Sequence, residues 1–372
     1  MASARVRRRR AALAVVVTAL SVMAVGRLLP DGPGAGALSR AFGQQATPFS
    51  GRLLVYGRHA LTPVQVAALT AAAHGPVTAV FAGELEVASG RPDYPLVPVL
   101  TMTADPLSYA AAAANPALAA ELRDGLVLST TGAALRGAAA GDVIRLAGGR
   151  PLKVTAVVPD ALLGGYEMGT SSAVLGPATA PNASYLLVGN ASSAAALRTA
   201  LPGIDLRIES KTANGLMSSA DTVLTQAQMK KEFGEFDVRV DGTRLRVDPT
   251  WRARWITSAV LPQLGIVTCN KAVMGPLRAA MVEITQRGLG SLVHTADFQR
   301  EGGCWSPRVE RFSAGEISAH TWGIAVDINV DANPLGATAK QDPRLVAIMR
   351  AHGFTWGGLF LRPDGAHFQW NR

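Results

Sequence analysis

The sequence predicts an α+β fold in two domains that follow an N-terminal export segment. Apolar residues make up 48% of the 372 residues and charged residues only 17%, so the chain can bury a substantial core. The length suits two domains of roughly 100–200 residues each. From about residue 51 to 210, short β-like runs alternate with alanine-rich helical runs, and a second domain of short, glycine-punctuated strands follows.

The charge balance excludes nucleic acid as the expected partner. The formal net charge is +9, but six of the 36 Lys and Arg residues lie in the first thirty positions, where no acidic residue occurs. The remaining 30 basic and 27 acidic residues give a net charge of +3, which is an ordinary protein surface. Two cysteines also exclude a disulfide scaffold and a multi-cysteine metal cluster.

Residues 1–30 have the pattern of a signal peptide or an uncleaved signal anchor. Arg5 and the arginines at 7–10 precede an apolar stretch at 11–26, and residues 31–50 are a linker rich in Gly, Ala, Pro and Gln. The stretch is short for a membrane span of about 20 residues, so cleavage and anchoring both stay open. Either way, the rest of the chain is extracytoplasmic, held at the membrane or secreted to the cell wall. A buried core helix is the alternative, but an arginine cluster is out of place beside one.

Strands and helices alternate in residues 51–210, the first expected domain. Strands are expected at 77–82, 96–102, 125–129, 143–146, 152–158, 185–188 and 206–208. Helices are expected at 63–73, with Thr62 as N-cap, at 106–124 with a break at Pro116, and at 192–200. Residues 211–236, rich in Ser, Thr, Gln and Lys, are assigned to a linker, so the second domain spans 237–372.

Metal-ligand residues gather near the C-terminus. His320 precedes a β-branched run at 324–330 from which Asp327 should project, and His367 precedes a strand-like run at 368–370. Two imidazoles and one carboxylate are the three protein ligands of a catalytic zinc site, which keeps a fourth position for water. Asp364, three residues before His367, can take a proton from that water, whose pKa falls toward ~7 on the metal. Each spacing alone is weak, and their combination in an exported chain is what indicates the site.

Three groups of motifs surround these residues. The run from Ser318 to Asn329 reads Ser-x-His-x-x-Gly-x-Ala-x-Asp-Ile-Asn, and Gly353-Phe-x-Trp-Gly-Gly is followed by Asp-x-x-His-Phe. Upstream stand Asp248-Pro-x-Trp, Leu264-Gly, Thr268-Cys and Gly303-Cys-x-x-Pro-Arg. Over about 120 residues this pattern resembles the zinc D,D-carboxypeptidases and L-alanyl-D-glutamate peptidases of the VanY type, which cut peptidoglycan stem peptides.

The resemblance implies a small α+β zinc-peptidase domain with a short antiparallel sheet, of the Hedgehog and D,D-peptidase kind. It assigns Zn²⁺ to His320, Asp327 and His367, with Asp364 as the general base. It places Arg308 where an arginine steadies the substrate carbonyl and its oxyanion. The residues expected to contact the stem peptide are Ser318, Trp356 and Gln369.

Several alternatives stay open for this domain. Asp364 and Ala366 stand where the carboxypeptidase branch commonly has Glu and Trp, so D-alanyl-D-alanine carboxypeptidase and L-alanyl-D-glutamate endopeptidase activity are both expected candidates. Arg308 could instead pair with Glu310 or Glu316. The competing function is a catalytically inactive peptidoglycan-binding or regulatory protein, against which the presence of both base and arginine speaks.

The two cysteines and the first domain complete the expectations. Cys269 and Cys304 flank the site, and an extracytoplasmic location permits a disulfide between them; a zinc role or two separate buried thiols are the alternatives. Residues 125–167 resemble the extracytoplasmic core domain of bacterial ABC-transporter permeases over some forty residues. That resemblance implies a non-catalytic interaction domain, so residues 51–210 are a candidate surface for a protein partner.

Overall fold

The computed structural model describes residues 48–176, 182–211, 224–241, 244–300, 303–309 and 316–371, and their fold is mixed α+β. Across these ranges the strands form one large sheet and two small ones. The predicted export segment at 1–30, and nearly all of the linker predicted at 31–50, lie outside the described residues. None of the described helices combines the length and the apolar character needed to cross a membrane.

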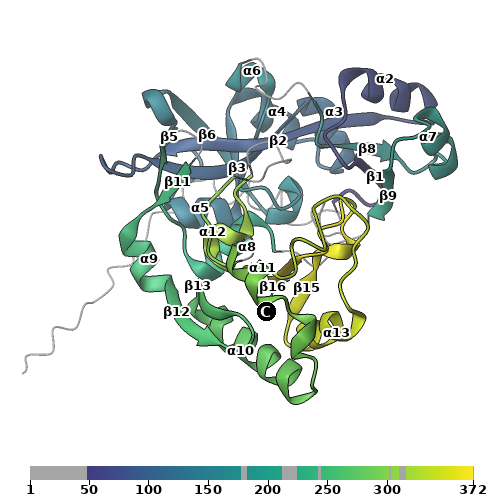
Figure 1. The fold of residues 1–372 in the computed structure, drawn as a ribbon. Coiled ribbons are helices and arrows are strands. Elements are labelled where there is room, and N and C mark those ends of the chain that lie inside the picture. The colour runs from purple at the N-terminus through teal and green to yellow at the C-terminus, as the bar shows by residue number, and fades with distance from the viewer. Residues whose placement is uncertain are drawn as a thin grey trace, which may run out of the picture.

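The large sheet runs across the top of Figure 1 and comes mainly from residues 52–211. Its described strands follow the order β5-β6-β4-β7-β3-β2-β8-β1-β9, while β10 pairs with β3 and β11. Most neighbours are antiparallel, but β3–β7 and β4–β6 are parallel. The strands are β1 (Arg52–Gly57), β2 (Val77–Ala88), β3 (Leu96–Ala104), β4 (Leu126–Ser129), β5 (Val143–Arg145), β6 (Pro151–Val158), β7 (Met168–Thr170), β8 (Tyr185–Gly189), β9 (Leu206–Lys211), β10 (Val238–Asp241) and β11 (Arg244–Val247).

Short helices connect these strands; three of the predicted stretches, at 63–73, 106–124 and 192–200, are helical, whereas α5 and α6 were not predicted. Thr62 caps the first of them, because its hydroxyl accepts the Gln65 amide while the Gln65 side chain accepts the Thr62 amide. The helix expected at 106–124 is divided near Pro116, as predicted. The helices are α2 (Pro63–Ala72), α3 (Pro106–Ala112), α4 (Leu118–Asp124), α5 (Thr130–Arg136), α6 (Ser172–Leu175) and α7 (Ala194–Ala200).

The C-terminal part lies beneath the large sheet in Figure 1. A hairpin of β12 and β13 is followed by the long helix α10, and the short antiparallel sheet expected near the C-terminus is present in the order β14-β16-β15. The elements are α9 (Pro249–Trp255), β12 (Ile256–Leu261), β13 (Gly265–Asn270), α10 (Lys271–Gln286), α11 (Thr295–Arg300), α12 (Ala319–Trp322), β14 (Ala325–Asp327), α13 (Pro343–Ala351), β15 (Phe354–Trp356) and β16 (His367–Trp370).

One helix lies where the sequence pattern predicts a linker. α8 (Gln226–Phe233) starts at Thr225 with a capping box, and Met229 and Phe233 are buried in the same core as the C-terminal strands. The polar composition of this stretch hides the helix, because Lys230 is buried by ion pairs rather than exposed. Residues 226–233 therefore differ from the expected linker, while the wider division into domains stays a prediction.

Candidate metal centre

A short helix and a tight turn bring His320 toward Asp327. α12 starts at Ser318, whose hydroxyl accepts the His320 amide at 3.4 Å, and it ends at Gly323 with φ 67°. A Cβ at Gly323 would lie 2.8 Å from the Asn270 nitrogen, so only glycine permits this approach. The chain then enters β14, which ends at Asp327 and is shorter than the strand expected at 324–330.

Asn270 fixes the end of this helix, and the sequence pattern did not single it out. Its main-chain nitrogen donates to the Gly323 carbonyl at 2.9 Å, and its side-chain Nδ2 donates to the Trp322 carbonyl at 3.1 Å. Asn270 is fully buried and also caps α10 by accepting the Ala272 amide. A polar residue directly before a helical run was the available signal, since asparagine favours the N-cap.

Strand pairing brings the second histidine to the same place. β16 lies antiparallel to β14 with His367 directly opposite Asp327. Side chains of directly opposed residues lie on one face of a sheet, about 4.5–5.5 Å apart at Cβ. Residues forty positions apart in sequence therefore share one site.

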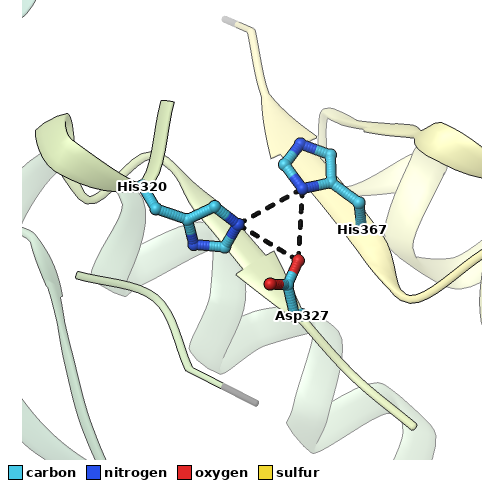
Figure 2. Close-up of side chains that lie close together, drawn as sticks. All are labelled: His320, Asp327 and His367. Atoms are coloured by element: carbon cyan, nitrogen blue, oxygen red, sulfur yellow. Dashed lines mark hydrogen bonds and ion pairs between the residues drawn. The ribbon is translucent and has the colours of Figure 1, made fainter. Parts of the chain in front are cut away.

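Three ligand atoms meet in a small triangle (Figure 2). His320 Nε2 lies 3.1 Å from Asp327 Oδ1 and 3.3 Å from His367 Nδ1, and the third side, from His367 Nδ1 to Asp327 Oδ1, is 3.2 Å. Zinc held about 2.0–2.1 Å from each ligand in tetrahedral geometry separates them by about 3.3 Å. The triangle thus has the edge length of a zinc tetrahedron.

The protonation of His320 also suits a metal. His320 Nδ1 lies 2.9 Å from the carbonyl oxygen of Cys304, which can only accept a hydrogen bond, so this nitrogen carries the proton of the neutral ring. The lone pair of Nε2 then faces a carboxylate oxygen, which is unfavourable unless a cation or a proton lies between them. A backbone carbonyl that fixes the tautomer in this way is a usual partner of a metal-binding histidine.

Asp327 is held in its ionised form. Burial acts to raise the pKa of its carboxyl, but the neighbouring imidazoles of His320 and His367 hold that pKa well below the usual range. Arg308 lies 3.5 Å from Oδ2, the other carboxylate oxygen. Among the described residues, the carboxylate that pairs with Arg308 is that of Asp327. Glu310, one of the two partners expected for Arg308, lies outside the described residues.

The segment 303–309 wraps around two of the three candidate ligands. Gly303 and Asp327 exchange main-chain hydrogen bonds, Ser306 donates its amide to the His320 carbonyl, and Arg308 is fixed to Thr321 through both its amide and its carbonyl. Cys304 anchors the segment, because it forms the expected disulfide with Cys269 at the end of β13. The disulfide prediction is therefore confirmed. The bond joins the β12–β13 hairpin to the segment 303–309.

Asp364 lies in the turn that leads into β16. Its amide donates to the Gly357 carbonyl at 2.9 Å, and its own carbonyl accepts the His367 amide at 3.1 Å. Trp356 braces this turn by donating Nε1 to the Gly365 carbonyl at 2.9 Å. The turn thus fixes the backbone of Asp364 relative to His367, and the role of its carboxylate stays a prediction.

Ser318 and Gln369 are both expected to contact substrate, but their side chains lie in different surroundings. Ser318 is 0% exposed and its hydroxyl caps α12, so its geometry gives it a role in positioning His320 rather than in touching a peptide. Gln369 lies two residues after His367 on β16, so the two side chains project from the same face. Gln369 is also buried, and its Nε2 has no hydrogen-bond partner among the described residues.

Residues 312–370 match the family model of the D-alanyl-D-alanine carboxypeptidases. The match includes all three residues of the triangle together with Asp364, Trp356 and Gln369, and it confirms the resemblance found in the sequence motifs. Arg308 and both cysteines precede it. The matched segment is therefore peptidase-like, and the reaction itself is taken up as a proposal below.

Two solved structures are similar to a little under half of this chain. One is the periplasmic region of MacB from Actinobacillus actinomycetemcomitans, with 11% identity, a TM-score of 0.33, and coverage of 46% of this chain and 94% of that one. Another is a domain assigned to a permease protein from Porphyromonas gingivalis, with 14% identity, a TM-score of 0.32, and coverage of 47% and 96%. No curated protein sequence matches the chain.

Proposed function

We propose that residues 237–372 form a zinc peptidase that hydrolyses peptidoglycan stem peptides, as a D-alanyl-D-alanine carboxypeptidase or an L-alanyl-D-glutamate endopeptidase. The observation that carries this proposal is the triangle of His320, Asp327 and His367, with sides of 3.1–3.3 Å, inside the segment that matches the carboxypeptidase family. Histidine and aspartate offer nitrogen and oxygen ligands that suit zinc, and three of them leave one position open.

His320 Nε2, Asp327 Oδ1 and His367 Nδ1 would hold the ion. When bound, zinc supplies a Lewis acid and lowers the pKa of a coordinated water to about 7. The Asp364 carboxylate takes a proton from the attacking water and passes it to the nitrogen of the leaving amine. The turn that ties Asp364 to Gly357 and His367 supports this role, because it fixes the base beside one ligand.

Arg308 would stabilise the oxyanion that forms on the peptide carbonyl. Its side chain is 34% exposed, and its contact with Asp327 is long at 3.5 Å, so the guanidinium can turn toward a substrate. Its backbone, by contrast, is fixed to Thr321 on α12. A cation on a fixed backbone close to the metal position is suited to electrostatic stabilisation of the transition state.

Gln369 would orient the peptide. A buried amide N–H without a partner costs about 1–3 kcal/mol, and a carbonyl or carboxylate of the substrate would satisfy it. Trp356 would contribute an apolar wall from the neighbouring strand β15. The Gln369 assignment is supported by its place on the same face of β16 as His367. Trp356, by contrast, lies opposite Phe368, on the other face, so its assignment rests on the sequence motif and on its contact with the turn of Asp364.

The proposed location is outside the cytoplasm, with the N-terminal segment as a cleaved signal or a membrane anchor. The Cys269–Cys304 disulfide supports this, because disulfides persist in oxidising compartments. A protein partner for residues 51–210 remains part of the proposal.

Mass spectrometry of muropeptides incubated with residues 31–372, with zinc and with a chelator, tests the function. We expect zinc-dependent cleavage that the chelator abolishes. Release of free D-alanine from a pentapeptide would identify the carboxypeptidase reaction, and release of a fragment headed by D-glutamate would identify the endopeptidase reaction. If zinc-loaded protein gives neither product, the inactive peptidoglycan-binding function replaces this one.

A further inference from the structure

We propose that Glu84, on strand β2 of the large sheet, is a positioning residue for the metal centre. Glu84 Oε1 accepts a hydrogen bond from the Ile317 amide at 3.2 Å, although the two residues are 233 positions apart in sequence. Ile317 comes three residues before His320. The inference rests on the proposed metal centre and adds to it a support that lies in the other half of the chain.

The chain between Ile317 and His320 is fixed so closely that a shift at Ile317 reaches the histidine. Ile317 is buried and forms an isolated β-bridge with Val309. The Ser318 amide donates to the Arg308 carbonyl at 3.0 Å, and the Ser318 hydroxyl then caps the helix that carries His320. Because each residue of this short path has a main-chain or capping bond, the path is rigid rather than a slack connection.

Glu84 is itself held by a cluster of buried polar groups. Gln226 Nε2 donates to Glu84 Oε2 at 3.2 Å and to Glu167 Oε1 at 3.3 Å. Glu167, which is 0% exposed, also pairs with Lys230 at 2.9 Å and with Arg136 at 2.8 Å. The remaining member of the cluster, Glu235, lies 3.0 Å from each of the same two cations.

Helix α8 connects this cluster to two of the three elements that carry the candidate ligands, α12 and β16. Gln226 and Lys230, on α8, face the large sheet through the cluster. At the other end of the helix, the Gly234 carbonyl accepts the Trp322 indole at 3.2 Å, and the Phe233 ring lies 6.0 Å from that of Trp370. Trp322 belongs to α12 with His320, and Trp370 belongs to β16 with His367, so α8 braces the metal centre against the sheet (Figure 1).

The protonation of Glu84 determines which substitution is conservative. Burial, reinforced by the charge of Glu167 and opposed by that of Lys230, raises the pKa of Glu84 to about 8. The neutral side chain is therefore the main form near neutral pH. Glutamine has nearly the same shape and keeps a carbonyl acceptor for the Ile317 amide, while its NH2 replaces Oε2, the acceptor of Gln226 Nε2. Alanine removes the acceptor and leaves the buried Ile317 amide without its partner.

The test compares the zinc affinities of Glu84→Ala and Glu84→Gln in the full-length protein, with zinc alone as the probe. We expect Glu84→Ala to weaken zinc binding about tenfold, as loss of a supporting hydrogen bond around a metal site does. Amides 317–323 should also exchange faster in the zinc-free protein. Glu84→Gln should restore both properties.

Two control variants separate positioning from a general loss of stability. Glu86→Ala makes the same change at an exposed position two residues along β2, and Val55→Ala removes buried methyl groups from β1 in another core cluster of the sheet. Both should leave zinc affinity and the exchange of amides 317–323 unchanged. Equal zinc affinity and equal exchange in Glu84→Ala and wild type would overturn the inference. A loss of zinc affinity that Val55→Ala shows to the same extent would also overturn the inference.

The design also keeps this inference distinct from the proposed function. Wild-type protein that binds no zinc would remove the proposed function, while amide exchange would still show whether Glu84 fixes the segment. Zinc binding and amide exchange that are both identical in wild type and Glu84→Ala would remove only the inference.

Discussion

The carbonyl oxygen of Cys304 accepts the Nδ1 proton of His320, so a main-chain atom decides which imidazole nitrogen faces the metal position. The same residue is half of the disulfide with Cys269. Asp327 supplies the charge of the site, and its depressed pKa keeps that charge at neutral pH. At the scale of single residues, the candidate ligands and the groups that orient them are thus different. Substitutions can therefore test the two roles one at a time.

The first prediction separates metal binding from catalysis. His320→Ala removes one corner of the triangle and should reduce bound zinc from about one ion per chain to a small fraction, with loss of activity. Asp364→Ala should keep the zinc and lower kcat/KM about 10²- to 10⁴-fold, the usual contribution of a general base. Metal analysis beside muropeptide assays measures both. Stoichiometric zinc in His320→Ala would remove this residue from the ligand set.

The second prediction concerns the turn between the first two candidate ligands. Gly323 and Gly288 have nearly the same φ, 67° and 69°, but a Cβ at Gly323 would approach the Asn270 nitrogen to 2.8 Å whereas nothing lies within 4 Å of one at Gly288. Alanine should cost about 1–2 kcal/mol at either position because of the left-handed backbone. Gly323→Ala should cost more and should also weaken zinc binding. Denaturant unfolding of Gly323→Ala and Gly288→Ala measures the loss of stability in each. Equal losses would mean that the close approach to Asn270 adds no cost at Gly323.

At the scale of elements, local signals predicted the strands that carry two of the candidate ligands. The β-branched run at 324–330 contains β14, and the strand-like run at 368–370 lies in β16. Helix α12 was not predicted, although Ser318 at its start and Gly323 at its end agree with the rules for helix caps. Strand β7 was not predicted, because it has three residues and a central glycine that packs against Met102. Helix α8 was assigned to a linker because tertiary ion pairs, which no local rule sees, bury Lys230.

The residues of the candidate site also fall into those that the sequence predicts and those that it does not. The triangle was predictable, since its residues stand in compact motifs and an antiparallel register brings Asp327 opposite His367. Asn270, Gln226 and Glu84 were not, because each acts through contacts between segments 52 to 233 positions apart. Spacing within a motif carries information about ligands, whereas their supports depend on how distant segments meet.

The third prediction concerns the disulfide, which joins strand β13 to the segment 303–309. The two cysteines are separated by 35 positions, and a loop of that size contributes about 4 kcal/mol in the chain-entropy model. Cys269→Ser with Cys304→Ser should lower the free energy of unfolding by up to that amount. It should also weaken zinc binding, because the Cys304 carbonyl would lose its anchor. Zinc titration under conditions where the variant is folded checks the second effect, and unchanged affinity would show that the segment holds His320 without the bond.

At the scale of the whole molecule, the two halves of the chain are joined by polar contacts as well as by strand pairing. β10 follows α8 and pairs with β3 of the large sheet at Val238 and Leu96. The cluster of Glu84, Glu167, Glu235, Arg136 and Lys230 draws its members from both halves. Three carboxyl groups share two cations, which accounts for a proton on one of them at neutral pH.

The last prediction follows from that proton. Glu84 has an ordinary pKa of 4.5 and a folded-state pKa of about 8, so the folded protein binds more protons than the unfolded chain between these values. Stability therefore falls as pH rises through this window, by at most about 1.4 kcal/mol per pH unit for a single group. Glu84→Gln removes the titration, so its free energy of unfolding should gain steadily on that of wild type between about pH 5 and pH 8 and level off above it. Urea unfolding across this range measures the difference, and Glu86→Gln, an exposed change on the same strand, should run parallel to wild type. A constant offset between Glu84→Gln and wild type at every pH would mean that the cluster holds Glu84 ionised, with its negative charge offset by Lys230.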